Sequence, residues 1–198
     1  MGKPALSPAS AAHSDVTGLG GETPTGSASE SSAAAPGALA PAPGPIEMKS
    51  PVASAMQAEL RALALDPSNL PPIEKLDAKA LRGVMKLIAK SLGAKCGDCH
   101  AEGDFAQPTP RKRVAAKMWD EFVVKLAFAA DGSPIFCDSC HQGRKKELDR
   151  TDKKALAKWM DANFVDRLKR KDDKEHDCET CHVDMEMHFL SRWAGVEL

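Results

Sequence analysis

Every cysteine in the chain belongs to one of three copies of a five-residue pattern, Cys-x-x-Cys-His. The copies begin at Cys96, Cys137 and Cys178, so the step from one copy to the next is 41 residues both times. Two thiols at this spacing can add to the two vinyl groups of one haem, and the histidine that follows can then ligate the iron. The pattern therefore predicts three covalently bound c-type haems. The predicted attachment residues are Cys96, Cys99, Cys137, Cys140, Cys178 and Cys181, and the predicted proximal iron ligands are His100, His141 and His182.

Three other uses of paired cysteines explain the pattern less well. A structural zinc ion takes four ligands, and three pairs divide poorly into tetrahedral sites. A redox-active dithiol usually occurs once, beside a strand–helix unit, and the sequence shows no strand pattern. A disulfide framework would not impose one local spacing three times. Covalent haem is therefore the favoured interpretation of all six cysteines.

Each haem iron also needs a ligand on the face opposite its histidine, unless that position stays open. A methionine at helical spacing is ordinarily a core residue, but one recurs on the helix predicted before each of the three motifs. These are Met85, Met118 and Met160, which lie 11, 19 and 18 positions before the first cysteine of their motifs. Methionines that follow the motifs would serve only two haems, because those after the third motif lie too close to it. We therefore predict these three methionines as distal ligands, with His188 as the alternative for the third haem.

The elements that must position these residues are helices joined by loops. Apolar residues at helical spacing, together with capping and breaking residues, predict five helices. The predicted helices span about 52–65, 77–92, 109–130, 151–168 and 183–194. Pro51 and Pro110 suit the first turn of a helix, and Gly93 suits a left-handed cap at the end of the second one. The result is a unit of helix, loop and haem motif that repeats along the chain.

Composition divides the chain into segments. Residues 1–50 are rich in Ala, Pro, Ser and Gly, which cannot bury a core, so we predict a disordered tether there. Residues 71–198 are predicted to form the domain with three haems, and 51–70 to form a short helix and linker. The chain has no Tyr and only six Phe residues, so its side chains alone would make a thin core. We therefore expect haem to contribute to folding as well as to function.

Charge and hydropathy exclude some classes of protein and leave others open. The formal net charge is −1, without the basic excess typical of nucleic-acid binding. The sequence has no run of eighteen apolar residues, so it predicts no membrane-spanning helix. Met1 is not followed by the apolar core of a signal peptide. Covalent haem is normally attached outside the cytoplasm. We therefore expect a periplasmic or extracytoplasmic mature protein, with any export signal or membrane anchor missing from this chain.

Basic runs occur at 111–113, 144–146 and 167–171. Such runs are usually solvated faces. Two other roles stay open for them here: pairing with haem propionates, and attraction of an acidic redox partner.

One stretch resembles a known repeat. Residues 84–100 run from Val-Met through Leu-Gly to the first haem motif, and an Asp-Phe pair (Asp104, Phe105) and the basic run 111–113 follow. This order resembles the repeat of the multihaem cytochrome subunit of photosynthetic reaction centres, best over 76–126 and more weakly to about 182. The resemblance implies a methionine ligand from the helix before each motif, which maps onto Met85, Met118 and Met160. This chain has three motifs where that subunit has four, which favours a general electron carrier.

These features predict a mostly α fold: a small, haem-cored multihaem cytochrome c of repeated helix–loop–CxxCH units. The predicted function is electron transfer between unidentified redox partner proteins, with no substrate chemistry of its own. One alternative is a haem enzyme whose open sixth position binds a small molecule such as peroxide or a nitrogen oxide. The other alternative is a sensor module that the tether joins to further machinery.

Overall fold

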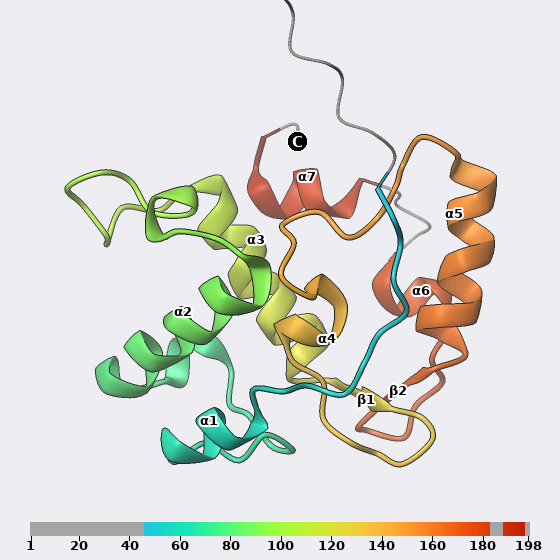
Figure 1. Cartoon of the computed structure of the whole chain (residues 1–198), viewed down its shortest axis with the longest axis horizontal. Helices are drawn as coiled ribbons and strands as arrows, with labels where there is room; N and C mark the ends of the chain where they lie inside the picture. Colours follow the sequence, from blue (N-terminus) through green and yellow to red (C-terminus); the bar gives the residue numbers. More distant parts are fainter. Residues whose placement is uncertain (1–45, 183–187, 197–198) are drawn as a thin grey trace, which may run out of the picture. The chain divides into compact units, whose positions relative to one another are not determined.

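A computed structural model describes residues 46–182 and 188–196 of the chain (Figure 1). Helices dominate this part, which confirms the predicted mostly α fold. The α-helices are α1 (Gln57–Ala62), α2 (Ala78–Leu92), α3 (Pro110–Met118), α4 (Cys137–His141), α5 (Lys153–Met160), α6 (Cys178–Cys181) and α7 (Phe189–Ala194). Short 3₁₀ turns are η1 (Ile73–Lys75) and η2 (Cys96–Asp98), π-helical turns are η3 (Trp119–Val123) and η4 (Asp161–Val165), and the strands are β1 (Leu126–Phe128) and β2 (Leu168–Arg170). No helix in the described ranges is long and apolar enough to cross a membrane.

Two predictions fall partly on residues beyond those ranges. Of the predicted tether over 1–50, only residues 46–50 are described. Likewise, residues 183–187, where the last helix was predicted to begin, lie outside the described part, and α7 runs from Phe189 to Ala194.

Predicted helix starts are confirmed where the capping residue acts locally. The Asp77 carboxylate accepts hydrogen bonds from the backbone N–H groups of the first turn of α2, and the Thr109 hydroxyl accepts one from Lys112 N at 3.2 Å in α3. Asp152 caps α5 in the same way as Asp77. Gly93 ends α2 with a φ of 59°, a left-handed conformation that glycine adopts without a steric cost.

The first helix was predicted to begin at residue 52, and this prediction is wrong: α1 begins at Gln57. The preceding backbone is not helical and is hydrogen-bonded to a distant segment instead. Val52 N donates to Ser139 O at 3.0 Å, and Ala55 N donates to a carboxylate oxygen of Asp138 at 2.8 Å. Since these N–H groups are committed to α4, the local preference of Pro51 for a first helical turn is overridden.

The two long helices predicted over 109–130 and 151–168 are also shorter than expected. Both α-helices end at a methionine, Met118 in α3 and Met160 in α5, and a π-helical turn follows each. Beyond these turns Leu126 and Leu168, which were predicted on helical faces, begin β1 and β2. The absence of strands inferred from the sequence is therefore wrong.

The strands β1 and β2 pair with each other in antiparallel register. Leu126 lies opposite Arg170, and Phe128 lies opposite Leu168. Both strands occupy the same place in their repeats, just after a π-helical turn. An antiparallel pair of equivalent strands relates the second and third repeats locally by a pseudo-two-fold axis, and neither strand would be stable alone.

The core has two parts. The larger cluster joins α1, α2, η3 and Phe136, and its centre is an edge-to-face pair of Trp119 and Phe136 with ring centroids 5.9 Å apart. Trp119 Nε1 donates to Pro71 O at 2.9 Å, so this fully buried indole also has a partner for its N–H group. The smaller cluster surrounds the strand pair. Because Phe136 directly precedes Cys137, the second motif starts within the core.

Candidate functional site

All three motifs adopt a short helical turn: η2 for the first, α4 for the second and α6 for the third. In the first motif His100 N donates to Cys96 O at 3.0 Å, and in the third His182 N donates to Cys178 O at 2.9 Å. Residues three and four apart in such a turn share one face. The turn therefore places both thiols and the imidazole of each motif on the same side, as attachment to one planar haem requires.

A short polar residue closes each of these turns. It occupies the position just before the second cysteine and accepts a hydrogen bond from the backbone N–H of the residue before the first one. The three closing residues are Asp98, Ser139 and Thr180. Their side chains hold the turn in shape. The sequence analysis missed this role, although a small polar residue at one position of all three motifs was a visible sign of it.

Two of the predicted iron ligands are oriented by a backbone carbonyl. His100 Nδ1 lies 3.1 Å from Phe105 O, and His141 Nδ1 lies 2.9 Å from Arg144 O. A carbonyl oxygen can only accept, so Nδ1 carries the proton and Nε2 presents its lone pair. This arrangement is typical of histidines that ligate a metal through Nε2. The third histidine, His182, packs edge-to-face against Phe189 with ring centroids 5.1 Å apart.

The six thiols are unpaired and lie in different surroundings. Burial raises the pKa of Cys137 and of Cys140 to about 12, and that of Cys181 to about 11. By contrast, Cys96 and Cys178 are exposed. The second motif is thus the one in which burial raises the pKa of both thiols this far.

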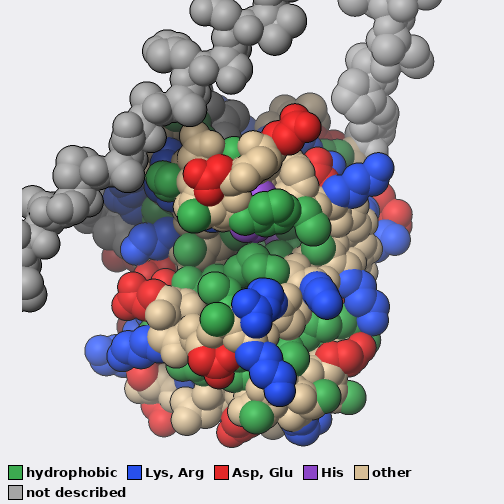
Figure 2. Space-filling view, turned by 90° about the vertical axis from the view of Figure 1, so that its left-hand side faces the viewer, with side chains coloured by type: hydrophobic (Ala, Val, Ile, Leu, Met, Phe, Trp, Pro, Cys, Tyr) green, Lys and Arg blue, Asp and Glu red, His purple; other side chains and the backbone are tan. Residues whose placement is uncertain are grey.

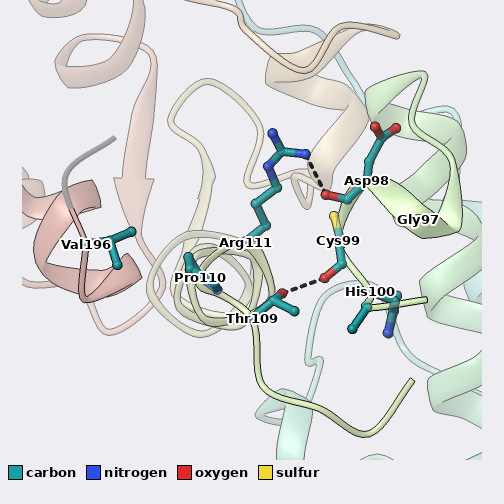
Figure 3. A pocket seen from close by; sticks show the side chains of 9 residues that line it. Gly97, Asp98, Cys99, His100, Thr109, Pro110, Arg111 and Val196 are labelled. Atoms are coloured by element: carbon teal, nitrogen blue, oxygen red, sulfur yellow. Dashed lines mark hydrogen bonds between the residues drawn. The ribbon is translucent and has the colours of Figure 1, made fainter. Parts of the chain in front are cut away.

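A cavity of about 350 Å³ opens beside the first motif (Figure 3). Residues 97–101 form one wall and residues 109–111 at the start of α3 form the other, with Val196 at the far end. Thr109 Oγ1 donates to Cys99 O at 2.5 Å, and Arg111 Nη1 donates to Asp98 O at 2.7 Å, so the two walls are tied together.

Figure 2 looks onto the side of α1 and α2 and shows hydrophobic side chains gathered across it, with histidine visible between them.

A second cavity, of about 240 Å³, lies at the third motif. Its lining includes Cys181 and Thr180 of the motif, side chains from α3 and η3, and Trp193 from α7. The helices α3 and α7 pack against each other, and Arg113 Nε donates to Ala194 O at 2.9 Å. A cavity therefore lies beside the second cysteine of each outer motif.

The second motif is enclosed by chain from both sides. On one side α4 packs against α2, and Gly143 N donates to Ser91 O at 2.8 Å. A Cβ on Gly93 would lie only 2.3 Å from Gly143 O, so the close approach also requires glycine at position 93. On the other side Gln142 Nε2 donates to Ser50 O at 2.8 Å. This enclosure positions α4 through contacts distant in the sequence.

The predicted distal ligands occupy two kinds of position. Met85 lies in the middle of α2, half-buried against the larger core cluster. Met118 and Met160 are half-buried and end their α-helices. The alternative ligand His188 is exposed just before α7. Another histidine, His176, accompanies the third repeat, and its Nε2 lies 3.2 Å from Phe164 O.

This donor set fits c-type haem better than zinc. Each motif supplies two thiols and an imidazole from one turn, and two of the imidazoles hold Nε2 ready for a metal. Within residues 46–182 and 188–196, no group of three or more His, Cys, Asp or Glu residues is arranged to hold a metal ion by itself. The two thiols and the imidazole that each motif presents suit a prosthetic group that brings its own metal.

The chain matches a known protein family over half of its length. The model of the family described as "Cytochrome c7 and related cytochrome c" matches residues 85–183, a range that includes the three motifs and the three predicted methionine ligands. No curated protein and no solved structure matches the chain.

Proposed function

Because the chain belongs to the family of cytochrome c7 and related cytochromes c, we propose that it is an electron carrier with three covalently bound haems. Membership in the family implies c-type haem and electron transfer, and it identifies a multihaem cytochrome without singling out the reaction-centre subunit. The number three is our inference from the motifs at Cys96, Cys137 and Cys178. The observation that carries it is the common helical turn, which puts two thiols and an imidazole on one face in each motif.

The chain's own residues attach and orient the cofactor. The cysteine thiols form the covalent links, and His100, His141 and His182 are the proximal ligands. Carbonyl oxygens of Phe105 and Arg144 fix two of these imidazoles. A hydrogen bond to Nδ1 makes Nε2 a stronger donor and prevents ring rotation. When bound, haem supplies the one-electron couple of its iron.

We propose Met85, Met118 and Met160 as distal ligands of the haems at the motifs that follow them. Met118 and Met160 are supported by the π-helical turns η3 and η4, which begin directly after them. Such turns insert one extra residue into a helix and occur frequently at functional sites. Their repetition at equivalent places gives both methionines the same local setting. His188 is kept as the alternative for the third haem.

We propose that the protein works outside the cytoplasm, where cytochromes of this kind are typically found. Its partners are other redox proteins, and it has no substrate chemistry of its own. The domain carrying the haems is proposed to span 71–198, preceded by the short helix and linker of 51–70 and by a disordered tether over 1–50.

The number of haems and their ligands can be tested on the native holoprotein. Its mass should correspond to the chain plus three haems, and fewer than three would refute the main proposal. Each of the variants Met85→Ala, Met118→Ala and Met160→Ala should lose one third of the methionine-to-iron absorption band, because one thioether ligand is removed. A variant that retains the full band would show that its methionine is not a ligand. The variant His188→Ala tests the alternative that His188, rather than Met160, is the distal ligand of the third haem.

A further inference from the structure

One half-buried side chain beside the second motif has two buried hydrogen-bond donors without acceptors. Arg144 Nε and Nη2 are both buried and both unpaired, whereas Nη1 donates to Glu47 O. Nε–H and Nη2–H form one edge of the planar guanidinium, and this edge donates two parallel hydrogen bonds to a carboxylate. A guanidinium stays charged at any ordinary pH, so leaving its edge buried and unpaired is costly.

Arg144 is fixed close to the predicted iron ligand of the second haem. Its backbone N donates to His141 O at 2.9 Å, and its carbonyl accepts from His141 Nδ1 at 2.9 Å. The same residue therefore orients the imidazole through its backbone and offers a paired donor edge through its side chain.

Acidic residues on both sides of Arg144 are engaged elsewhere. The Asp138 carboxylate accepts hydrogen bonds from Ser54 and Ala55, and the Asp149 carboxylate accepts from Thr151. Glu147 Oε2 lies 3.3 Å from His141 Nδ1. None of these carboxylates pairs with the guanidinium edge among the ion pairs of the described residues.

We propose that Arg144 binds a propionate carboxylate of the haem attached at Cys137 and Cys140. This inference rests on the proposed function, because haem brings the carboxylates. The bidentate contact would satisfy both orphaned N–H groups and place a fixed positive charge beside the second haem. It would raise the reduction potential of that haem, since the charge stabilises the more negative reduced state. The first motif has no counterpart, because Gly103 occupies the equivalent position.

The test is a redox titration and a resonance Raman spectrum of the holoprotein and three variants. In Arg144→Gln the equilibrium between oxidised and reduced forms should shift by about tenfold toward oxidised for one haem only, which is about 59 mV for a one-electron couple. The propionate bending band should change at the same time, because the paired hydrogen bonds are lost. Arg144→Lys should shift the potential less while still changing the band, since it keeps the positive charge but loses the two parallel N–H donors. Lys146→Gln, an exposed neighbour, should change neither.

The outcomes separate this inference from the proposed function. A parent protein with fewer than three haems would refute the proposed function. If three haems are present and Arg144→Gln leaves every potential and the propionate band unchanged, the contact does not exist. An equal shift in Lys146→Gln would show that only general charge matters and would also overturn the proposal. If the Arg144→Gln protein fails to assemble, the propionate band of Arg144→Lys tests the contact. A changed band supports the contact, and an unchanged band refutes it.

Discussion

The first and second haem motifs share one pattern of residues but differ in what surrounds them. The turn of the first motif is exposed at Cys96, and its histidine packs at a tilt against Phe105, a residue that is 62% exposed. The turn of the second motif is enclosed between α2 and the segment 50–55 that precedes α1. The same five-residue pattern thus lies at the surface in one case and within the core in the other.

This difference arises from residues that attachment does not require. Lys95, which precedes the first motif, is exposed, whereas its equivalent Phe136 is 2% exposed and packs on Trp119. Between the cysteines, Gly97 has nothing near its Cβ position, whereas its equivalent Asp138 binds Ser54 and Ala55. We therefore expect substitutions around the second motif to lower the free energy of unfolding of the whole fold. Equivalent substitutions around the first motif should change it little.

The largest effect is expected from truncating the residue before each motif. Phe136→Ala removes a buried ring from the centre of the larger core cluster and should lower the free energy of unfolding by about 3–5 kcal/mol. Lys95→Ala, at the equivalent exposed position, should change it by less than about 0.5 kcal/mol. Denaturant unfolding of both holoproteins measures the difference. Similar losses in the two variants would show that the motifs are equally buried.

A smaller effect is expected at the second position of the motif. Asp138→Ala leaves the Ser54 hydroxyl and Ala55 N–H without their acceptor and should cost about 1–3 kcal/mol. The matched control is Gly97→Ala in the first motif, where the added methyl group meets no atom within 4 Å. Amide hydrogen exchange should quicken at Ala55 in the first variant and stay unchanged there in the control. Unaltered exchange at Ala55 would mean that Asp138 does not anchor the segment.

Local features of the fold were predictable from the sequence, and features made by distant contacts were not. Thr109-Pro110 and Gly93 determine helix ends through neighbouring backbone groups, so their positions were predicted correctly. The strands β1 and β2 are three residues each and exist only because they pair across about forty residues of chain. The late start of α1 likewise depends on Asp138, more than eighty residues away.

The candidate site likewise has local features that were predictable from the sequence and distant contacts that were not. The five-residue pattern predicted which thiols and imidazoles share a face, because a helical turn is local. It gave no indication that Phe105 O and Arg144 O hold the imidazoles, since those carbonyls come from loops whose course depends on the rest of the fold. The methionine ligands stay a prediction. For Met118 and Met160 it is supported by the π-helical turns that follow them, which the helical spacing of apolar residues did not predict.

The smallest effect concerns the residue that closes each turn, because only one of the two motifs uses a titratable group. Asp98 accepts from Lys95 N at 2.8 Å, whereas the equivalent Ser139 hydroxyl accepts from Phe136 N at 3.1 Å. The backbone hydrogen bond from Lys95, followed by the contact with Lys145, lowers the pKa of Asp98 below its ordinary value. A carboxyl whose pKa is lowered on folding stabilises the fold above its unfolded pKa and loses that contribution as the pH falls through its folded pKa.

Asp98→Ser should therefore make the first turn behave like the second. The serine hydroxyl can still close the turn, but the pH-dependent contribution and the contact with Lys145 are lost. The variant should be slightly less stable than the parent at neutral pH, and the two unfolding free energies should converge as the pH falls below about 4. Taking the difference between the two proteins cancels the titration of all other acidic groups. Parallel curves down to about pH 3 would show that the Asp98 carboxylate contributes nothing to the first turn that serine does not also provide.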